Sequence, residues 1–357
     1  MDPLGVAVVG LGIGRAHLAA FRELPDRWRV LAVCDPDARR RDRAAEVSGA
    51  SPAAALEDLL GDPAIDVVDI CSPPALHLEQ AVAALGSGHH VIVEKPATGS
   101  LAELDQLAAA ADAARRQVMP VFQYRFGNGV RRLRHLVDAG ATGRAHTATV
   151  EVAWRRRPDY YAVPWRGTWA GELGGALSSH ALHAVDMLVW ILGPPTRVCG
   201  RVTTRVNPVE TEDTAAALLE WADGALGTLS VTLGSSAEIS RHRFCFEHLT
   251  AESGTAPYDN GADPWTITPD SDEVAATLAR ALGGFVPGPE GYVALFAAVA
   301  DAMRAGAPPP VTLADAAAAL EVVDAVRWSS ATGGSVALPL PSGHPARVGA
   351  ASMIGRT

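Results

Sequence analysis

The stretch Leu4-Gly5-Val6-Ala7-Val8-Val9-Gly10-Leu11-Gly12-Ile13-Gly14-Arg15-Ala16-His17 decides the fold, because it runs from an apolar strand through a glycine turn into an amphipathic helix. This is the context that a dinucleotide-binding fingerprint requires. Glycines let the backbone approach a pyrophosphate closely, and the N-terminus of the following helix favours its negative charge. The residues expected to form this part of the site are Gly10, Gly12, Ile13, Gly14 and Arg15.

The spacing of these glycines departs from the usual G-x-G-x-x-G pattern, because this chain reads G-x-G-x-G. Two explanations stay open. Either the turn is one residue shorter, or Arg15 occupies the slot of the third glycine and contacts phosphate.

Strands and helices continue to alternate behind this unit. Such alternation predicts a parallel, doubly wound sheet with right-handed crossovers, which binds ligands at the carboxyl ends of its strands. The expected strands are Arg29–Cys34, Val67–Cys71, one from His90 to Glu94-Lys95, and Val118–Gln123, and the expected helices are Pro36–Val47, Pro52–Leu60, one ending at Leu85, and Leu101–Arg115.

Asp35 follows the second strand at the position where an acidic residue binds the ribose hydroxyls of the adenosine. It can equally be the N-cap of the next helix. Its charge would repel a 2′-phosphate, so the sequence favours NAD over NADP. NADP stays possible because a run of arginines follows, namely Arg39, Arg40, Arg41 and Arg43.

Polar residues follow two more strands, and Pro96 ends the second of them in a rigid turn. A lysine at a strand end is usually solvated. Because several strand ends bring polar groups to one sheet edge, Lys95 is predicted to be functional. The expected cofactor contacts here are Ser72, Pro73, His77, Glu94 and Lys95.

The pattern changes after residue 124. The strand-like runs alternate, which suits a mainly antiparallel sheet with one covered face, and Asp223-Gly224 is a hairpin signal. Residues 1–124 are predicted to form a Rossmann domain, 125–340 an α/β domain for substrate binding and oligomerisation, and 341–357 a flexible tail. The expected elements are strands Ala145–Trp154, Thr196–Val206, Ala215–Trp221, Ala225–Leu233 and Arg241–Glu247, helices Val130–Ala139, Ser179–Leu192, Pro289–Ala305 and Leu313–Ser329, and a loop Ala251–Asp272.

Composition excludes several classes of function. The 357 residues are 48% hydrophobic and 20% charged with a net charge of -10, which argues against nucleic acid or an anionic membrane as partner. We see neither a signal peptide nor an apolar window long enough to span a membrane. The four cysteines lack metal spacing and are expected to be buried free thiols, as suits a cytoplasmic protein: Cys34, Cys71, Cys199 and Cys245.

A second group of chemically informative residues follows a glycine pair. His180, His183 and Asp186 are spaced by three and share a helix face. Histidine exchanges protons near neutral pH, although a buried structural histidine is an equal alternative. Asp186 can orient a histidine or bond backbone. The spacing is weak evidence for a metal, and none is predicted.

These motifs together resemble the Gfo/Idh/MocA oxidoreductase family over about residues 4–340. The resemblance rests on the glycine turn, Ser72-Pro73-Pro74 with His77, Glu94-Lys95-Pro96, and Gly174-Gly175 with His183, Asp186 and Leu192-Gly193. It implies a Rossmann domain that binds NAD or NADP and an α/β domain with a large open antiparallel sheet. That sheet commonly forms a dimer or tetramer interface.

By the same resemblance, Lys95 and His183 lie beside the nicotinamide and the reacting carbinol. Arg125 is also among the expected cofactor contacts. Many sugar dehydrogenases of the family carry an aspartate four residues before the histidine, where this chain has Ser179. We therefore transfer no aspartate role to this chain.

The predicted activity is reversible oxidation of a secondary alcohol on a sugar, cyclitol or glycoside. His183 is the expected general base, and Lys95 the group that stabilises the alcohol oxygen. The run Arg155-Arg156-Arg157 either favours an anionic substrate or is a solvated loop. The alternatives are an NAD-dependent glycosidase using transient oxidation and a ligand-sensing protein on the same fold. The expected substrate contacts are Tyr124, Trp165, Arg166, Ser179, His180 and His183.

Overall fold

The computed structural model describes residues 2–349, and these form two compact units. The first unit comprises Met1–Val121 and Tyr292–Ala316, and the second comprises Phe122–Gly291 and Ala317–Thr357. The segment Tyr292–Ala316 therefore joins the first unit, although the boundary expected from the sequence assigned it to the second. Each unit is described by itself below.

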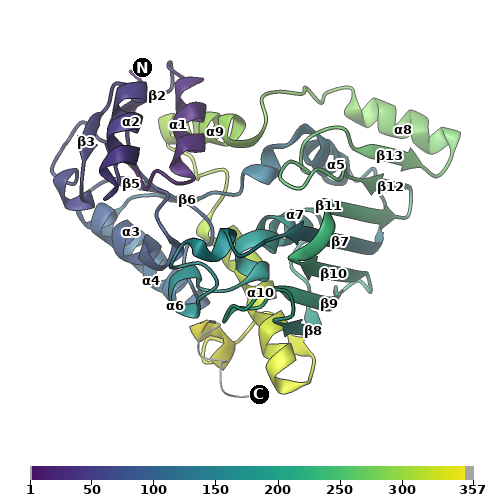
Figure 1. The fold of residues 1–357 in the computed structure, drawn as a ribbon. Helices are drawn as coiled ribbons and strands as arrows, with labels where there is room; N and C mark the ends of the chain where they lie inside the picture. The colour runs from purple at the N-terminus through teal and green to yellow at the C-terminus, as the bar shows by residue number, and fades with distance from the viewer. Residues whose placement is uncertain (1, 350–357) are drawn as a thin grey trace. The chain divides into compact units, whose positions relative to one another are not determined.

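The first unit is a parallel sheet of six strands in the order β3-β2-β1-β4-β5-β6 (Figure 1). This order and the intervening helices confirm the predicted doubly wound Rossmann sheet. Its strands are β1 (Leu4–Val9), β2 (Trp28–Cys34), β3 (Ser51–Ala53), β4 (Val67–Ile70), β5 (His90–Val93) and β6 (Val118–Pro120). Its helices are α1 (Gly14–Arg22), α2 (Ala38–Ser48), α3 (His77–Gly86), α4 (Leu101–Ala114) and α9 (Gly291–Ala305).

The central strands of this sheet are apolar because both of their faces are covered. Every residue of β4 is buried, as are the last three of β5. Helix α9 returns from far along the chain and lies beside α1 (Figure 1). There Phe296 stacks on Phe21 at 4.4 Å, and its carbonyl accepts a hydrogen bond from Trp28 Nε1 at 3.0 Å. The segment Tyr292–Ala316 thus completes the core of the first unit.

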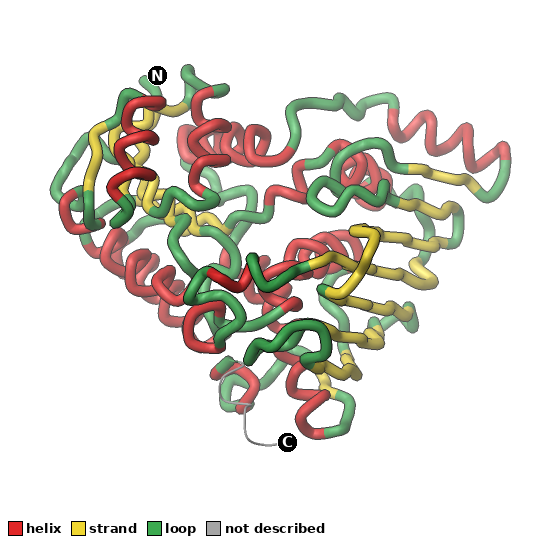
Figure 2. Tube along the Cα trace, in the orientation of Figure 1, coloured by secondary structure: helices red, strands yellow, loops and turns green. Residues whose placement is uncertain are grey.

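The second unit is built on an eight-stranded sheet in the order β13-β12-β11-β7-β10-β9-β8-β14, drawn in yellow in Figure 2. Only the β7–β10 pair is parallel among the described pairs, so the mainly antiparallel prediction is confirmed. Its strands are β7 (Ala145–Arg155), β8 (Arg197–Thr203), β9 (Thr214–Glu220), β10 (Leu226–Thr232), β11 (Gly234–Phe246), β12 (Leu249–Glu252), β13 (Thr266–Pro269) and β14 (Val336–Ala337). Its helices are α5 (Asn128–Asp138), α6 (Trp169–Glu172), α7 (Leu182–Leu192), α8 (Asp272–Leu282) and most of α10 (Leu313–Thr332).

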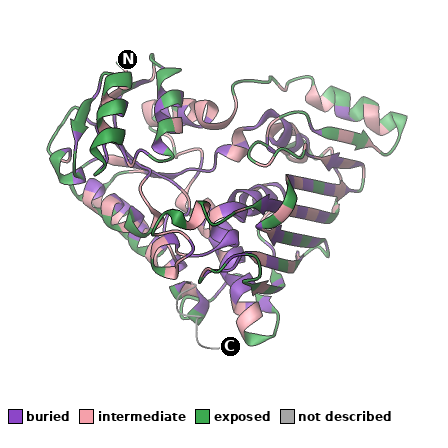
Figure 3. Cartoon of the chain, viewed as in Figure 1, coloured by how far each residue is buried: buried purple, intermediate pink, exposed green. Residues whose placement is uncertain are grey.

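Burial alternates along the strands of this second sheet, as Figure 3 shows in purple and green. One face is packed by helices: Ser329 of α10 accepts a hydrogen bond from Gly200 N at 2.9 Å, and His242 of β11 lies 2.9 Å from the carbonyl of Ala184 in α7. The predicted hairpin is present, with Gly224 at φ +91 between β9 and β10. The alternation seen in the sequence was therefore a reliable guide here.

Several expectations about local structure are wrong. The segment expected as a helix at Pro52–Leu60 forms β3 and a 3₁₀ turn at Leu56–Asp58. The expected loop Ala251–Asp272 contains β13, and α8 follows it. The expected helix Ser179–Leu192 begins earlier, as a π-helical turn over Leu177–Ala181 that continues into α7.

The expected tail and the cysteines also differ in part. Pro345–Val348 form a 3₁₀ helix, and the rest of the tail from residue 350 lies outside the described residues. Cys34 and Cys71 are buried as predicted, but Cys199 is exposed and Cys245 is half-buried. Cys199 lies on β8, where alternate side chains face outward, which explains its exposure.

The stretch Trp169–Leu192 is long and apolar enough to cross a membrane by length and composition, and an 18-residue window within it has a mean hydropathy of 1.3. The expectation that the sequence holds no such window is wrong for this stretch. In the structure 83% of that 18-residue window is buried. The stretch is therefore the core helix of the second unit rather than a membrane span.

Candidate active site

The glycine turn of the first unit is one residue shorter than the usual fingerprint. Gly10 has φ +90, and a Cβ there would lie 2.5 Å from the backbone nitrogen of Ser72. A Cβ on Gly14 would lie 3.1 Å from Val8 Cγ1 and 3.3 Å from Cys71 Cβ. Gly14 thus allows the close helix–strand packing that the third glycine of the fingerprint provides.

This turn fits a pyrophosphate. Helix α1 begins at Gly14, and no side chain among residues 2–349 caps its N-terminus at Ile13, so its first N–H groups are available to an anion. A Cβ on Gly12 would have no neighbour within 4 Å, so this side of the turn is open. Arg15 is exposed, and its Nε donates to Gly12 O at 3.2 Å. A phosphate contact from Arg15 stays a prediction.

Asp35 braces the glycine turn. Its carboxylate is 5% exposed, and it accepts hydrogen bonds from the backbone nitrogens of Leu11 and Asp37, both at 2.8 Å. The alternative that Asp35 caps the next helix is wrong, because Asp37 is the N-cap of α2 and accepts from Arg39 N at 2.9 Å. Binding of the ribose hydroxyls by Asp35 stays a prediction.

His77 joins the loops after β4 and β5. Its Nδ1 lies 2.8 Å from Pro96 O and its Nε2 lies 2.9 Å from Ser72 O. Burial lowers the pKa of His77. The Ser72 hydroxyl donates to Gln80 Oε1 at 2.6 Å. The structure therefore uses His77 to hold two of the predicted cofactor loops together.

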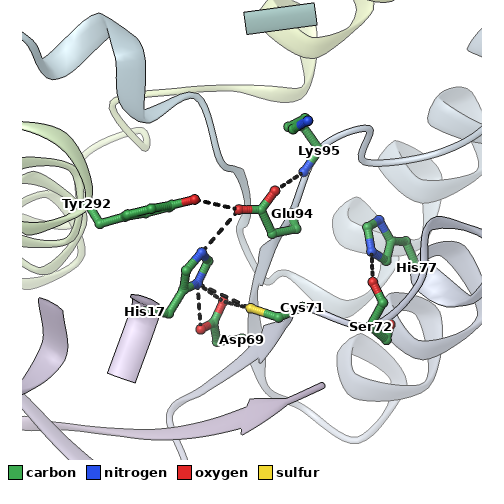
Figure 4. A network of polar contacts seen from close by, with 8 residues as sticks. All are labelled: His17, Asp69, Cys71, Ser72, His77, Glu94, Lys95 and Tyr292. Atoms are coloured by element: carbon green, nitrogen blue, oxygen red, sulfur yellow. Dashed lines mark hydrogen bonds and ion pairs between the residues drawn. The ribbon is translucent and has the colours of Figure 1, made fainter. Parts of the chain in front are cut away.

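Glu94 lies at the centre of a buried polar network that includes the Lys95 turn (Figure 4). One oxygen, Oε2, accepts from the backbone nitrogen of Lys95 at 2.9 Å. The other, Oε1, lies 3.1 Å from His17 Nε2 and accepts from the Tyr292 hydroxyl at 3.2 Å. The Lys95–Pro96 peptide bond is cis. The carboxylate thus fixes the backbone from which the Lys95 side chain leaves.

His17 connects Glu94 to a second carboxylate. Its Nδ1 lies 2.9 Å from Asp69 Oδ2 and 3.2 Å from Cys71 Sγ, and its side chain is fully buried. Burial opposes a charge on His17, but Asp69 and then Cys71 outweigh it and hold its pKa well above the usual value. Tetrahedral zinc ligands would lie about 3.5 Å apart. The shorter separations here are those of hydrogen bonds around an imidazolium.

In the second unit, aromatic rings hold His183. Tyr124 stacks on its ring at 4.5 Å, and Phe122 meets it edge-on at 5.8 Å. Arg125 binds Asp186 through two hydrogen bonds, Nε to Oδ2 at 2.7 Å and Nη2 to Oδ1 at 2.5 Å. The sequence did not suggest this buried pair. It ties the Tyr124 segment to helix α7, and with it fixes the stacking on His183.

His180 is held in its neutral form. Arg156 Nε donates to His180 Nε2 at 3.0 Å, and a guanidinium can only donate. The imidazole proton of His180 therefore lies on Nδ1. The Arg156 guanidinium also lies 5.0 Å from the rings of Trp154 and Tyr160.

The remaining predicted substrate residues lie near these groups. Arg166 stacks over Tyr160 at 3.8 Å and over Trp165 at 5.1 Å. The Ser179 hydroxyl donates to Glu172 Oε1 at 2.7 Å. A pocket of about 330 Å³ carries charges of both signs and is lined by Arg155, Arg156, Arg157, Asp159, Tyr160 and Glu238.

Sequence reasoning missed His17, Asp69 and Glu172, and it named Arg156 only as part of the run Arg155-Arg156-Arg157. His17 offered one signal, because a histidine on the buried side of an amphipathic helix needs polar partners. The partners themselves lie far along the chain and could not be read from it.

The Rossmann sheet and the glycine turn at Gly10–Gly14 are those of an NAD-dependent oxidoreductase. A family model described as "Oxidoreductase family, NAD-binding Rossmann fold" matches residues 4–122, and the model "GFO/IDH/MocA C-terminal domain" matches residues 130–248. The chain belongs to the GFO/IDH/MocA oxidoreductase family.

Several relatives are similar over most of the chain. A scyllo-inositol 2-dehydrogenase (NADP(+)) IolW of Bacillus subtilis is 23% identical over 350 residues, which are 92% of this chain and 94% of that protein. The crystal structure of the WlbA dehydrogenase from Bordetella pertussis in complex with NADH and UDP-GlcNAcA is 26% identical with a TM-score of 0.84, covering 95% of this chain and 100% of that one. An uncharacterised oxidoreductase of Synechocystis is 30% identical over 249 residues, and the match covers 65% of its length.

Proposed function

We propose that this protein is an NAD(P)-dependent dehydrogenase that interconverts a secondary alcohol and a ketone on a sugar, cyclitol or glycoside. NAD is the expected cofactor, with NADP as an alternative. We further propose a cytoplasmic homodimer or homotetramer that forms through the eight-stranded sheet. The exposed face of that sheet carries Leu218 and Leu226, which are 41% and 47% exposed. Light scattering after gel filtration measures the oligomeric state.

One observation carries the catalytic part of this proposal: Lys95 is the only lysine in the chain. The sequence holds 30 basic residues, and the other 29 are arginines. Arginine stays charged and spreads its charge over a planar fork, whereas lysine is a compact point charge that can lose its proton. A chain that uses arginine everywhere else but lysine at Lys95 indicates a need for an amine there.

The proposed roles follow from the chemistry of the two residues. His183, oriented by Tyr124, takes the proton of the reacting hydroxyl as general base. Lys95, on the turn fixed by Glu94, donates a hydrogen bond to the same oxygen and stabilises its developing negative charge. The glycine turn at Gly10–Gly14 would hold NAD(P), which would supply the hydride acceptor or donor. His180 is kept neutral by Arg156, so it is assigned to hold other substrate hydroxyls rather than to act as the base.

The relatives support a sugar-like substrate. Their names include scyllo-inositol 2-dehydrogenase and levoglucosan dehydrogenase, the latter from Pseudarthrobacter phenanthrenivorans and 26% identical over 267 residues. The WlbA structure contains a sugar nucleotide with an acidic sugar. A substrate panel should therefore contain cyclitols, anhydrosugars, glycosides and sugar acids.

The test compares the wild type with Lys95→Ala, Lys95→Arg and His183→Ala on this panel, following the absorbance of the reduced nicotinamide. Loss of a positioned acid–base group costs about 10²–10⁴-fold in turnover. We expect such losses in all three variants, and NAD binding measured by calorimetry in parallel separates a loss of turnover from a loss of cofactor. Turnover retained in Lys95→Ala and His183→Ala would refute these roles. Release of an aglycone without net cofactor reduction would instead indicate a glycosidase.

A further inference from the structure

We propose that Glu172 is a positioning residue that turns the Ser179 hydroxyl into a hydrogen-bond acceptor for a substrate hydroxyl. This inference rests on the proposed function, because it places Ser179 in the substrate site beside His183. It makes Glu172 a determinant of which hydroxyl pattern the site accepts.

The carboxylate of Glu172 has a fixed place. Glu172 is the last residue of α6, and it is 2% exposed. Oε2 accepts a hydrogen bond from Gly167 N at 2.6 Å. The loop is locked on both sides: Thr168 caps α6 by accepting from Gly171 N at 3.1 Å, and Gly167 has φ +71. Oε1 is therefore held where it meets Ser179 Oγ at 2.7 Å.

This contact decides the direction of the Ser179 hydroxyl. An ionised carboxylate can only accept, so Ser179 must donate its single proton to Glu172. Only lone pairs of the Ser179 oxygen then remain for other groups. A donor such as a sugar hydroxyl is recognised by such an oxygen, whereas an ether oxygen is not. Glu172 thus gives a serine the acceptor character of a carboxylate without placing a charge against the substrate.

Ser179 is well placed for this role. It is half-buried, while its neighbours Ser178 and His180 are buried. It belongs to the π-helical turn Leu177–Ala181, which leads directly into the helix of His183. Single π-turns inserted in a helix are frequent at functional sites, because they re-aim side chains.

The pKa of Glu172 is raised above its usual value, because burial outweighs the hydrogen bonds from Ser179 and Gly167 and the charge of Arg166, which lower it. Glu212 raises it further. Burial, and after it the charge of Glu172, raises the pKa of the nearby phenols of Tyr160 and Tyr161 and keeps them protonated. If Glu172 were protonated, its O–H would donate to Ser179 Oγ, and the direction of this hydrogen bond would reverse. Substrate binding should therefore weaken as pH falls through the pKa of Glu172.

The variant Glu172→Gln tests the polarity with little change of shape. Its amide oxygen can still accept from Gly167, while its NH₂ donates to Ser179 and reverses that bond. One lost hydrogen bond corresponds to about a tenfold change. We expect Glu172→Gln and Ser179→Ala each to raise KM about tenfold, with a smaller change in kcat, and the double variant to be no worse than either. The rise in KM that we expect for the wild type at acid pH should vanish in both variants.

Glu210→Gln is the matched control, because Glu210 Oε2 accepts from Trp169 N at 3.0 Å and so braces the same α6 segment without touching Ser179. We expect it to keep the wild-type KM. Additive effects in the double variant, or an unchanged pH profile of KM, would overturn the proposal. The substrate analogue that lacks one hydroxyl adds a direct test, since Glu172→Gln should discriminate against it less than the wild type does.

A failure of the proposed function would look different, because the wild type itself would then reduce no cofactor with any sugar. The hydrogen bond can still be tested in that case by infrared titration of the carboxyl band that Glu172→Gln removes. Ser179→Ala should raise the pKa read from this band, because it removes a hydrogen bond to the ionised form. An unchanged titration would overturn the inference by itself.

Discussion

Asp324 makes the second unit less stable as pH rises from acid to neutral. This aspartate on α10 is fully buried, and its Oδ1 accepts from Arg327 Nη1 at only 3.4 Å. Arg327 is held more closely elsewhere, since its Nη2 donates to Glu212 at 2.6 Å and to Ser178 at 2.8 Å. Asp324 Oδ2 has no hydrogen-bond partner among residues 2–349. Burial is the largest cause that raises the pKa of Asp324 to about 7, and Arg327 only partly opposes it.

The linkage between protonation and folding gives the direction and size of the change in the free energy of unfolding with pH. The pKa of Asp324 is raised from 3.8 in the unfolded chain, so the stability it contributes is present below pH 3.8 and is lost as pH rises to about 7. At 1.36 kcal/mol per pH unit, that difference corresponds to roughly 4 kcal/mol in the free energy of unfolding. About 3 kcal/mol of it falls between pH 5 and pH 7.5.

Asp324→Asn removes this titration and keeps an oxygen for Arg327. Urea unfolding, followed by tryptophan fluorescence at a series of pH values, should show the variant gaining on the wild type by about 3 kcal/mol between pH 5 and pH 7.5. Asp138→Asn is the control, because its exposed carboxylate pairs with Arg134 on the surface of α5. It should run parallel to the wild type. If Asp324→Asn also runs parallel, Asp324 is ionised throughout and the reasoning is refuted.

Two further changes test the first unit. His17→Gln should destabilise the protein most below about pH 6.5, because the pKa of His17 is raised in the folded state and its stabilisation is lost as pH rises through that value; unfolding free energies that differ equally at acid and alkaline pH would contradict this. Asp35→Asn leaves one of the two N–H groups of Leu11 and Asp37 without an acceptor, so it should cost about 1–3 kcal/mol and weaken NAD binding measured by calorimetry, whereas Asp37→Asn, which keeps a good N-cap, should do neither.

The parallel sheet could be predicted almost entirely from sequence, because each buried strand is a short apolar run and each connection begins with a turn signal. The alternation of polar and apolar residues predicted the second sheet. It did not predict the elements at the edge of that sheet, β13 and α8. Strand β13 has only four residues, and helix α8 buries only Leu278, so neither carries a strong hydrophobic period. Edge elements of this kind are decided by what they pack against.

The candidate site could likewise be predicted only in part. The sequence predicts the residues that belong to motifs. It does not predict the residues whose side chains hold those motif residues in place. His17 illustrates the reason, because its partners Asp69 and Glu94 lie 52 and 77 positions away in the sequence. The sequence around His17 does not indicate that Asp69 and Glu94 are its partners. Only the sheet topology, which brings the ends of β4 and β5 beside α1, creates the network.

Glu94 and Glu172 show what this topology adds to the chemistry. Each buried carboxylate spends one oxygen on a backbone N–H, Lys95 N or Gly167 N, which cannot move and can only donate. The second oxygen is thereby fixed, and it meets His17 in one case and the Ser179 hydroxyl in the other. An exposed carboxylate could not do this, since water would compete for both oxygens. Because removing a carboxylate from water is costly, these two are better explained by orientation of Lys95 and Ser179 than by a gain in stability.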